Sequence, residues 1–80
     1  MTIGEAVRQR ILALCDERSI TVNKLAIMSG MTQSTLNNIV NQRNRSTTVS
    51  TVQKICDGLD ISIKDFFNSD LFDNVEQEIK

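Results

Sequence analysis

Apolar residues recur every three or four positions over most of the chain, and this spacing predicts helices throughout. The first apolar stripe predicts a helix over residues 3–17 and consists of Ile3, Val7, Ile11, Leu14 and Cys15. Thr2 followed by Glu5 is a capping-box pattern, which places the start of this helix. The longest strand-like alternation is residues 60–63, so the pattern predicts an all-α protein.

Four further helices are expected beyond the first. The second should span about residues 22–29 and the third about residues 33–41. Gly30 lies between them, where glycine can adopt a left-handed turn at little cost. The polar, basic residues 42–47 predict a loop. A fourth helix, capped by Thr48, should bury an apolar stripe of Val49, Val52, Ile55, Cys56 and Leu59. Ser62 with Asp65 opens a short fifth helix that contains Ile63, Phe66 and Phe67.

The third predicted helix divides into an apolar and a polar face. Thr32 can cap it, and Leu36 and Ile39 should face the core. The residues left on the outside carry amide and hydroxyl groups: Gln33, Ser34, Asn37 and Asn38. Such a face can form hydrogen bonds with base edges in the major groove of DNA, although the same residues would also suit a merely solvated surface.

Charge is unevenly distributed along the 80 residues. The net charge is −1, which by itself does not indicate a nucleic-acid partner. Over residues 20–56, however, the charged side chains are all positive, namely Lys24, Arg43, Arg45 and Lys54. The acidic residues gather towards the two ends of the chain. A positive central segment favours contact with phosphate.

Composition argues against several other classes of protein. The chain has no histidine, no glycine-rich phosphate loop, no cluster of metal ligands and no nucleophile with a neighbouring base, so we expect neither an enzyme nor a metal or cofactor. No small-molecule ligand is evident. Without a long apolar run or a visible signal peptide, a cytoplasmic protein with no membrane contact is expected. Cys15 and Cys56 are predicted to be small buried hydrophobes rather than a redox switch, and Met28 and Met31 to fill the core.

From about Val7 to Phe67 the chain resembles the Cro/C1-type (XRE) helix-turn-helix family, the lambdoid phage repressor type. Two linked motifs carry the resemblance: Leu25, Ala26, Gly30, Met31, Leu36 and Ile39, then Thr51, Val52, Lys54, Ile55, Leu59, Ile61, Ser62, Asp65, Phe66 and Phe67. The resemblance implies a compact five-helix, lambda-repressor-like DNA-binding domain over residues 1–69. An acidic, amphipathic tail over residues 70–80 follows it.

The resemblance also implies roles for individual residues. The start of the third helix would contact bases in the major groove through Thr32, Gln33, Ser34, Asn37 and Asn38. Phosphate contacts would fall to Asn23, Arg43, Asn44 and Arg45. The chain departs from the family at Val22, where a phosphate-binding glutamine is common, and at Thr47, where a proline is usual. It also departs at Val40 and Cys15, where phage repressors can place an ion pair. We interpret Val40 and Cys15 as an apolar contact, a replacement that is often neutral or stabilising.

Leu71, Phe72, Val75 and Ile79 are spaced for one apolar face of a helix in the tail. This face could fold back as a sixth helix, or it could form a two-fold interface together with Phe67. We favour a homodimer through Phe67, Leu71, Phe72 and Val75, which would place two recognition helices about 34 Å apart, one turn of DNA.

The sequence therefore predicts a sequence-specific, duplex-DNA-binding transcriptional regulator, and specifically a repressor. The alternative is a protein-interaction module, such as an antitoxin or a degenerate helix-turn-helix whose main partner is protein. The acidic tail and the near-neutral net charge favour the alternative. The positive centre and the polar face of the third helix favour DNA.

Overall fold

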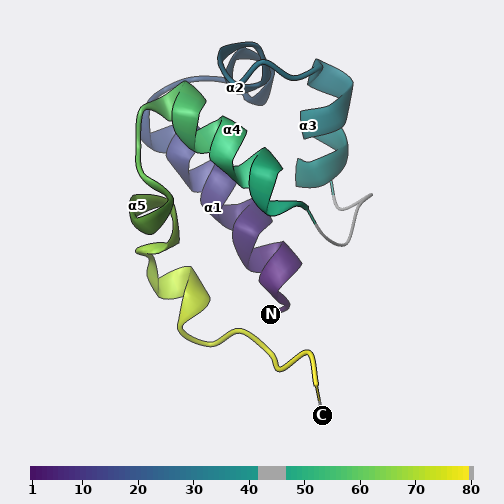
Figure 1. The fold of residues 1–80 in the computed structure, drawn as a ribbon, viewed down its shortest axis with the longest axis vertical. Helices are drawn as coiled ribbons and strands as arrows, with labels where there is room; N and C mark the ends of the chain where they lie inside the picture. The colour runs from purple at the N-terminus through teal and green to yellow at the C-terminus, as the bar shows by residue number, and fades with distance from the viewer. Residues whose placement is uncertain (42–46, 80) are drawn as a thin grey trace.

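The computed structural model describes residues 1–41 and 47–79, which form five α-helices and a short 3-10 helix. They are α1 (Ile3–Glu17), α2 (Val22–Met28), α3 (Gln33–Val40), α4 (Val49–Leu59), α5 (Ile63–Phe67) and the 3-10 helix η1 (Asp70–Phe72). Helix α2 packs against α3 and α4, and α3 also contacts α1. Helix α5 packs against α4, and η1 against α1. Figure 1 shows α3 and α5 on opposite sides of the molecule, with α1 and α4 between them. The all-α, five-helix prediction is confirmed.

A hydroxyl side chain begins every one of the five α-helices. Each accepts a hydrogen bond of 3.0–3.1 Å from the backbone N–H three residues further on. These caps satisfy N–H groups that have no partner within the helix, and they explain why the helix starts could be predicted closely. The capping residues are Thr2, Thr21, Thr32, Thr48 and Ser62.

Helices α1, α2 and α4 end in the same way, with one residue of left-handed backbone followed by an apolar residue. Gly30 has φ of +68° after α2, as predicted. Its N–H donates to the carbonyl of Ile27, and the N–H of Met31 reaches back to the carbonyl of Ala26 at 3.0 Å. This is the Schellman arrangement, which satisfies the last carbonyls of a helix. Ser19 and Asp60 take the left-handed position after α1 and α4, and Ile20 and Ile61 then pack against the core.

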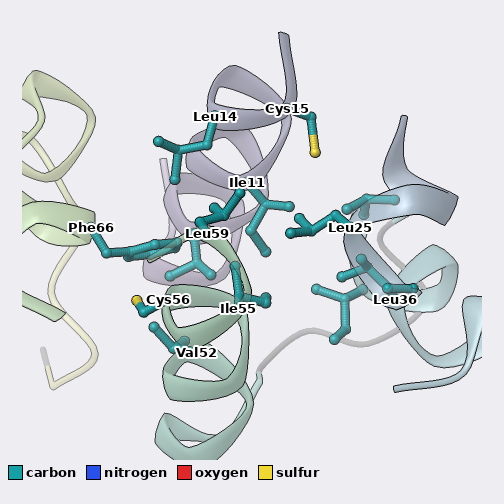
Figure 2. Close-up of a cluster of buried hydrophobic side chains, with 14 residues drawn as sticks. Ile11, Leu14, Cys15, Leu25, Leu36, Val52, Ile55, Cys56, Leu59 and Phe66 are labelled. Carbon is teal, nitrogen blue, oxygen red and sulfur yellow. The ribbon is translucent and has the colours of Figure 1, made fainter. Parts of the chain in front are cut away.

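The core is one cluster to which all five α-helices contribute. Figure 2 shows Ile11 of α1 and Leu59 of α4 at its centre, with Phe66 of α5 on one side and Leu25 and Leu36 on the other. These side chains are at most 2% exposed. The prediction that Leu36 and Ile39 face the core is confirmed, and Leu25 of the same motif is buried with them.

Three predicted core positions are instead at the edge of the cluster. Val49 is 79% exposed, and Ile3 and Met28 are also exposed. Val49 and Ile3 are the first residues of α4 and α1, and Met28 is the last residue of α2. Because helix ends extend past the elements that cover them, periodicity alone overestimates burial there.

The prediction of an apolar helix face in the tail was wrong. Only Asp70–Phe72 forms a 3-10 turn, residues 73–79 contain no helix, and Ile79 is 88% exposed. Asp73 and Asn74 favour turns over helix, because their short polar side chains compete for backbone hydrogen bonds.

The tail nevertheless folds back onto its own domain. The ring of Phe72 lies 4.9 Å from that of Phe67 and 6.4 Å from that of Phe66, measured between centroids. Further along, the Glu76 N–H donates to the Met1 carbonyl at 2.9 Å, and the Met1 ammonium lies 3.9 Å from a Glu76 carboxylate oxygen.

Cys15 and Cys56 are free and buried, as the sequence predicted. Burial raises the pKa of both thiols, and the neighbouring carboxylate of Asp57 raises the pKa of Cys56 further. Both side chains are therefore protonated at neutral pH and pack as small apolar groups. Among the helices of the described ranges, none combines the length and the apolar character that a membrane span requires.

Candidate nucleic-acid interface

Helix α3 has one buried and one solvent-facing side, as its sequence predicted. Leu36, Ile39 and Val40 are buried in the core. Gln33 and Ser34 are exposed in the first turn, together with Thr35, and Asn37 and Asn38 are half-buried. Ala26 of α2 is fully buried, and its small side chain permits the close packing of α2 against α3. The two helices thus hold the first turn of α3 at the surface.

Thr32 acts as the cap of α3, and its hydroxyl already has partners. Its Oγ1 accepts from the Thr35 backbone N–H at 3.1 Å and lies 2.7 Å from the Thr35 Oγ1. A base contact from Thr32 would have to share a hydroxyl engaged in capping. Thr35 was not among the predicted site residues, although its spacing of three from a capping threonine is a signal in the sequence.

Asn37 and Asn23 are joined by a hydrogen bond that runs from α3 to α2. The Asn37 Nδ2 donates to the Asn23 Oδ1 at 3.0 Å. The bond joins a residue predicted to contact bases with one predicted to contact phosphate. Periodicity gives no sign of it, because the two residues are fourteen positions apart on different helices.

Helices α2 and α3 contain a single charged residue, Lys24, which is exposed and follows Asn23 directly. Neither helix has an acidic residue to oppose an approaching phosphate. Asn41, the C-cap of α3, is also exposed. The predicted phosphate contacts Arg43, Asn44 and Arg45 lie outside the described residues.

Three of the residues that depart from the family pattern, Val22, Cys15 and Val40, have apolar surroundings. Val22 is partly buried and packs against the core, so it offers no polar group where a glutamine is common. Cys15 and Val40 both belong to the buried core cluster, in agreement with apolar packing in place of an ion pair. Over residues 1–41 and 47–79, no three of the His, Cys, Asp and Glu side chains are grouped so that they could hold a metal ion.

Comparison with known proteins agrees with this arrangement. Residues 10–70 match the family described as Cro/C1-type HTH DNA-binding domain. The matched segment includes all of α2, α3, α4 and α5 and the larger part of α1. Neither a curated protein nor a solved structure matches the chain. On the strength of a match over most of its length, the chain belongs to the Cro/C1-type helix-turn-helix family of DNA-binding domains.

Proposed function

We propose that this protein is a sequence-specific regulator of transcription that binds duplex DNA and acts as a repressor. One observation carries the proposal: α3 is anchored by three buried apolar residues while its first turn presents Gln33 and Ser34 to solvent. An anchored helix with a polar first turn can enter a major groove without disturbing the core. The likeness of the sequence to lambdoid phage repressors supports repression over activation.

The base contacts in this proposal come from Gln33, Ser34 and Asn38, with Asn37 beside them. Gln33 is the first residue of α3 and is exposed. Its amide can form a bidentate pair with adenine, donating to N7 and accepting from the N6 amino group. Thr32 contributes by capping the helix, which fixes the direction of the first turn.

Phosphate contacts are assigned to Asn23 and Lys24 at the start of α2 and to Arg43, Asn44 and Arg45 after α3. Lys24 and Asn23 are both exposed and have no acidic neighbour on their helix. The two arginines are the next positively charged residues along the chain after Lys24. Such contacts strengthen binding to every duplex and make it dependent on salt concentration.

The test is selection of bound sequences from random duplex DNA at a recorded salt concentration. We expect enrichment of a short motif repeated with two-fold symmetry, and a reporter gene placed behind that motif should be expressed less when the protein is present. If no sequence is enriched at any salt concentration, the proposal fails and a protein-interaction module becomes the better explanation.

Homodimerisation is part of the same proposal. Helix α5 leaves Ile63 and Phe67 each 39% exposed, and the Phe67 ring contacts that of the partly buried Phe72 in η1. Leu71 and Val75, which are also partly buried, lie close to Phe72 in sequence. Phe72 also packs against the rings of its own domain, so its share of an interface is smaller than the sequence suggested. This face lies on the opposite side of the molecule from α3 (Figure 1), where it leaves the recognition helix free.

Sedimentation of matched variants tests the dimer. Ile63→Glu places a charge in the proposed interface and should convert the dimer to a monomer. Ile27→Glu is the control, because Ile27 is 62% exposed but lies on α2. If both variants and the parent chain sediment with equal masses, α5 is not part of the interface.

A further inference from the structure

The hydrogen bond between Asn37 and Asn23 determines how the Asn37 amide is turned. The Asn37 Nδ2 donates to the Asn23 Oδ1 at 3.0 Å, so the Asn37 Oδ1 is left for another partner. We propose that Asn23 is a positioning residue that decides which atom of the Asn37 amide faces the bases. This inference rests on the proposed function, because it concerns how that DNA sequence is recognised.

An asparagine pair of this kind has two arrangements. Each amide carries two N–H donors on nitrogen and an acceptor on oxygen, so turning both side chains over would give an equally good bond in the reverse direction. The two arrangements differ in which amide atom of Asn23, nitrogen or oxygen, faces away from Asn37. In the structure its Nδ2 remains available, whereas in the reversed pair its oxygen would face outwards.

Phosphate selects the arrangement seen in the structure. Phosphate oxygens only accept hydrogen bonds and are negatively charged, so they bind the Asn23 Nδ2 and repel a carbonyl oxygen. With Nδ2 directed at phosphate, the Asn23 Oδ1 is left to accept from Asn37. A contact with the DNA backbone, which carries no sequence information of its own, thereby sets which atom of the Asn37 amide faces the bases.

The orientation predicts the base that Asn37 prefers. Asn37 keeps its whole Oδ1 and one N–H for the groove. Adenine offers a donor at N6 and an acceptor at N7, which is the complementary pair. Guanine offers acceptors at both O6 and N7, so it cannot satisfy an outward Oδ1. We therefore expect adenine at the position opposite Asn37 and rejection of guanine there.

The experiment compares two substitutions of Asn23 on the full chain, with binding measured to the selected duplex and to duplexes altered at each base pair. Asn37→Ala first identifies the base pair that Asn37 contacts. Asn23→Ala should lower affinity and also reduce discrimination at that same base pair, by about 5- to 150-fold if a bidentate pair is lost. The double variant should lose no more discrimination there than Asn37→Ala alone.

Asn23→Asp separates positioning from phosphate contact. Its carboxylate still accepts from the Asn37 Nδ2 but repels phosphate, so affinity for every duplex should fall while discrimination at the Asn37 base pair is retained. Asn41→Asp is the matched control for charge, because Asn41 is an exposed asparagine at the other end of α3. It should lower affinity without changing discrimination at the Asn37 base pair.

The possible results separate this inference from the proposed function. If the parent chain prefers a sequence but Asn23→Ala weakens all duplexes by one common factor, Asn23 is a phosphate contact only and the positioning role is overturned. If Asn23→Asp loses as much discrimination as Asn23→Ala, the direction of the bond does not matter and the inference is also overturned. If the parent chain shows no sequence preference, the proposed function is wrong, and this inference fails with it.

Discussion

A Cβ atom placed on Gly58 would lie 2.7 Å from the Oγ of Ser29 and 2.9 Å from the carbonyl oxygen of Met28. Helix α4 thus crosses the C-terminal end of α2 at a separation that only glycine permits. The crossing matters for the candidate interface, because α2 is the helix that supports α3. Ser29 is buried there, and within the described residues its Oγ has no hydrogen-bond partner.

Gly58→Ala should destabilise the protein, although alanine is the better helix former. The propensity gain of about 1 kcal/mol is opposed by overpacking against backbone atoms of Met28, which typically costs about 1–3 kcal/mol. Since the Met28 carbonyl cannot rotate away as a side chain can, we expect the overpacking to exceed the gain. Urea denaturation of the parent and the variant measures the difference in free energy of unfolding.

Ser29→Ala provides the control for this crossing. The substitution removes a buried hydroxyl without a partner in the described structure, so on its own it should be neutral or slightly stabilising. Combined with Gly58→Ala it should recover part of the lost stability, because one of the close contacts disappears while that with Met28 remains. A Gly58→Ala variant more stable than the parent would mean that the two helices separate easily.

Leu25→Ala and Ile27→Ala form a matched pair on α2. Leu25 is fully buried in the core, whereas Ile27 is 62% exposed. Emptying the Leu25 site should lower the free energy of unfolding by about 2–5 kcal/mol. Ile27→Ala should change it by no more than about 0.5 kcal/mol, the usual range for surface positions. Equal losses in urea denaturation would contradict the orientation of α2 described above.

Arg10 joins α1 to the end of α5 through two backbone carbonyls. Its Nε donates to the Phe66 carbonyl at 2.7 Å and its Nη2 to the Asp65 carbonyl at 2.9 Å. Hydrogen bonds from charged donors typically contribute about 1.5–3 kcal/mol. Because the contact with Asp65 is exposed, we expect Arg10→Ala to lower the free energy of unfolding by about 1–3 kcal/mol. Arg10→Lys should lose most of the same free energy, since lysine lacks the two-pronged geometry.

Arg18→Lys is the corresponding control for Arg10. Arg18 is exposed at the C-cap of α1, and its cap is made by the backbone N–H. The exchange should leave the thermal midpoint unchanged. If Arg10→Lys is equally silent, the contact between α1 and α5 does not depend on the guanidinium.

The features that could be predicted from the sequence are local ones. Helix starts are set by a hydroxyl and an N–H three residues away, as at Thr2 and Thr48, and the turn at Gly30 needs only one residue with left-handed backbone. Both are visible as short patterns. The polar face of α3 follows from the period of a helix in the same way.

The features that were missed depend on which elements meet. Arg10 bonds to a carbonyl 56 residues away, and no spacing within α1 reveals it. The bond from Asn37 to Asn23 likewise needs the crossing of two helices. Val49 fits the apolar stripe of α4 but is exposed, because none of the described elements covers the first turn of that helix well enough to bury it. Periodicity identifies a face, whereas burial depends on its neighbours.

The last prediction separates base recognition from phosphate binding and tests the proposed function directly. Gln33→Ala removes an exposed amide from the first turn of α3. It should weaken the free energy of binding to the selected site by about 1–3 kcal/mol and change binding to other sequences little. Discrimination should weaken at one base pair in each half-site, which we expect to be adenine–thymine. Arg45→Ala should instead weaken binding to every duplex and reduce the salt dependence by about one charge.

Binding to the selected and to scrambled duplexes over a series of salt concentrations distinguishes the two effects. The ratio of the two affinities should fall for Gln33→Ala and stay constant for Arg45→Ala, because phosphate carries no sequence information. Lys64→Ala is the control for loss of a positive charge, since Lys64 lies on α5, away from α3 (Figure 1), and should leave the ratio unchanged and the affinity nearly so. If neither Gln33→Ala nor Arg45→Ala alters binding to any duplex, DNA is contacted elsewhere and the assignment of α3 as the recognition helix is wrong.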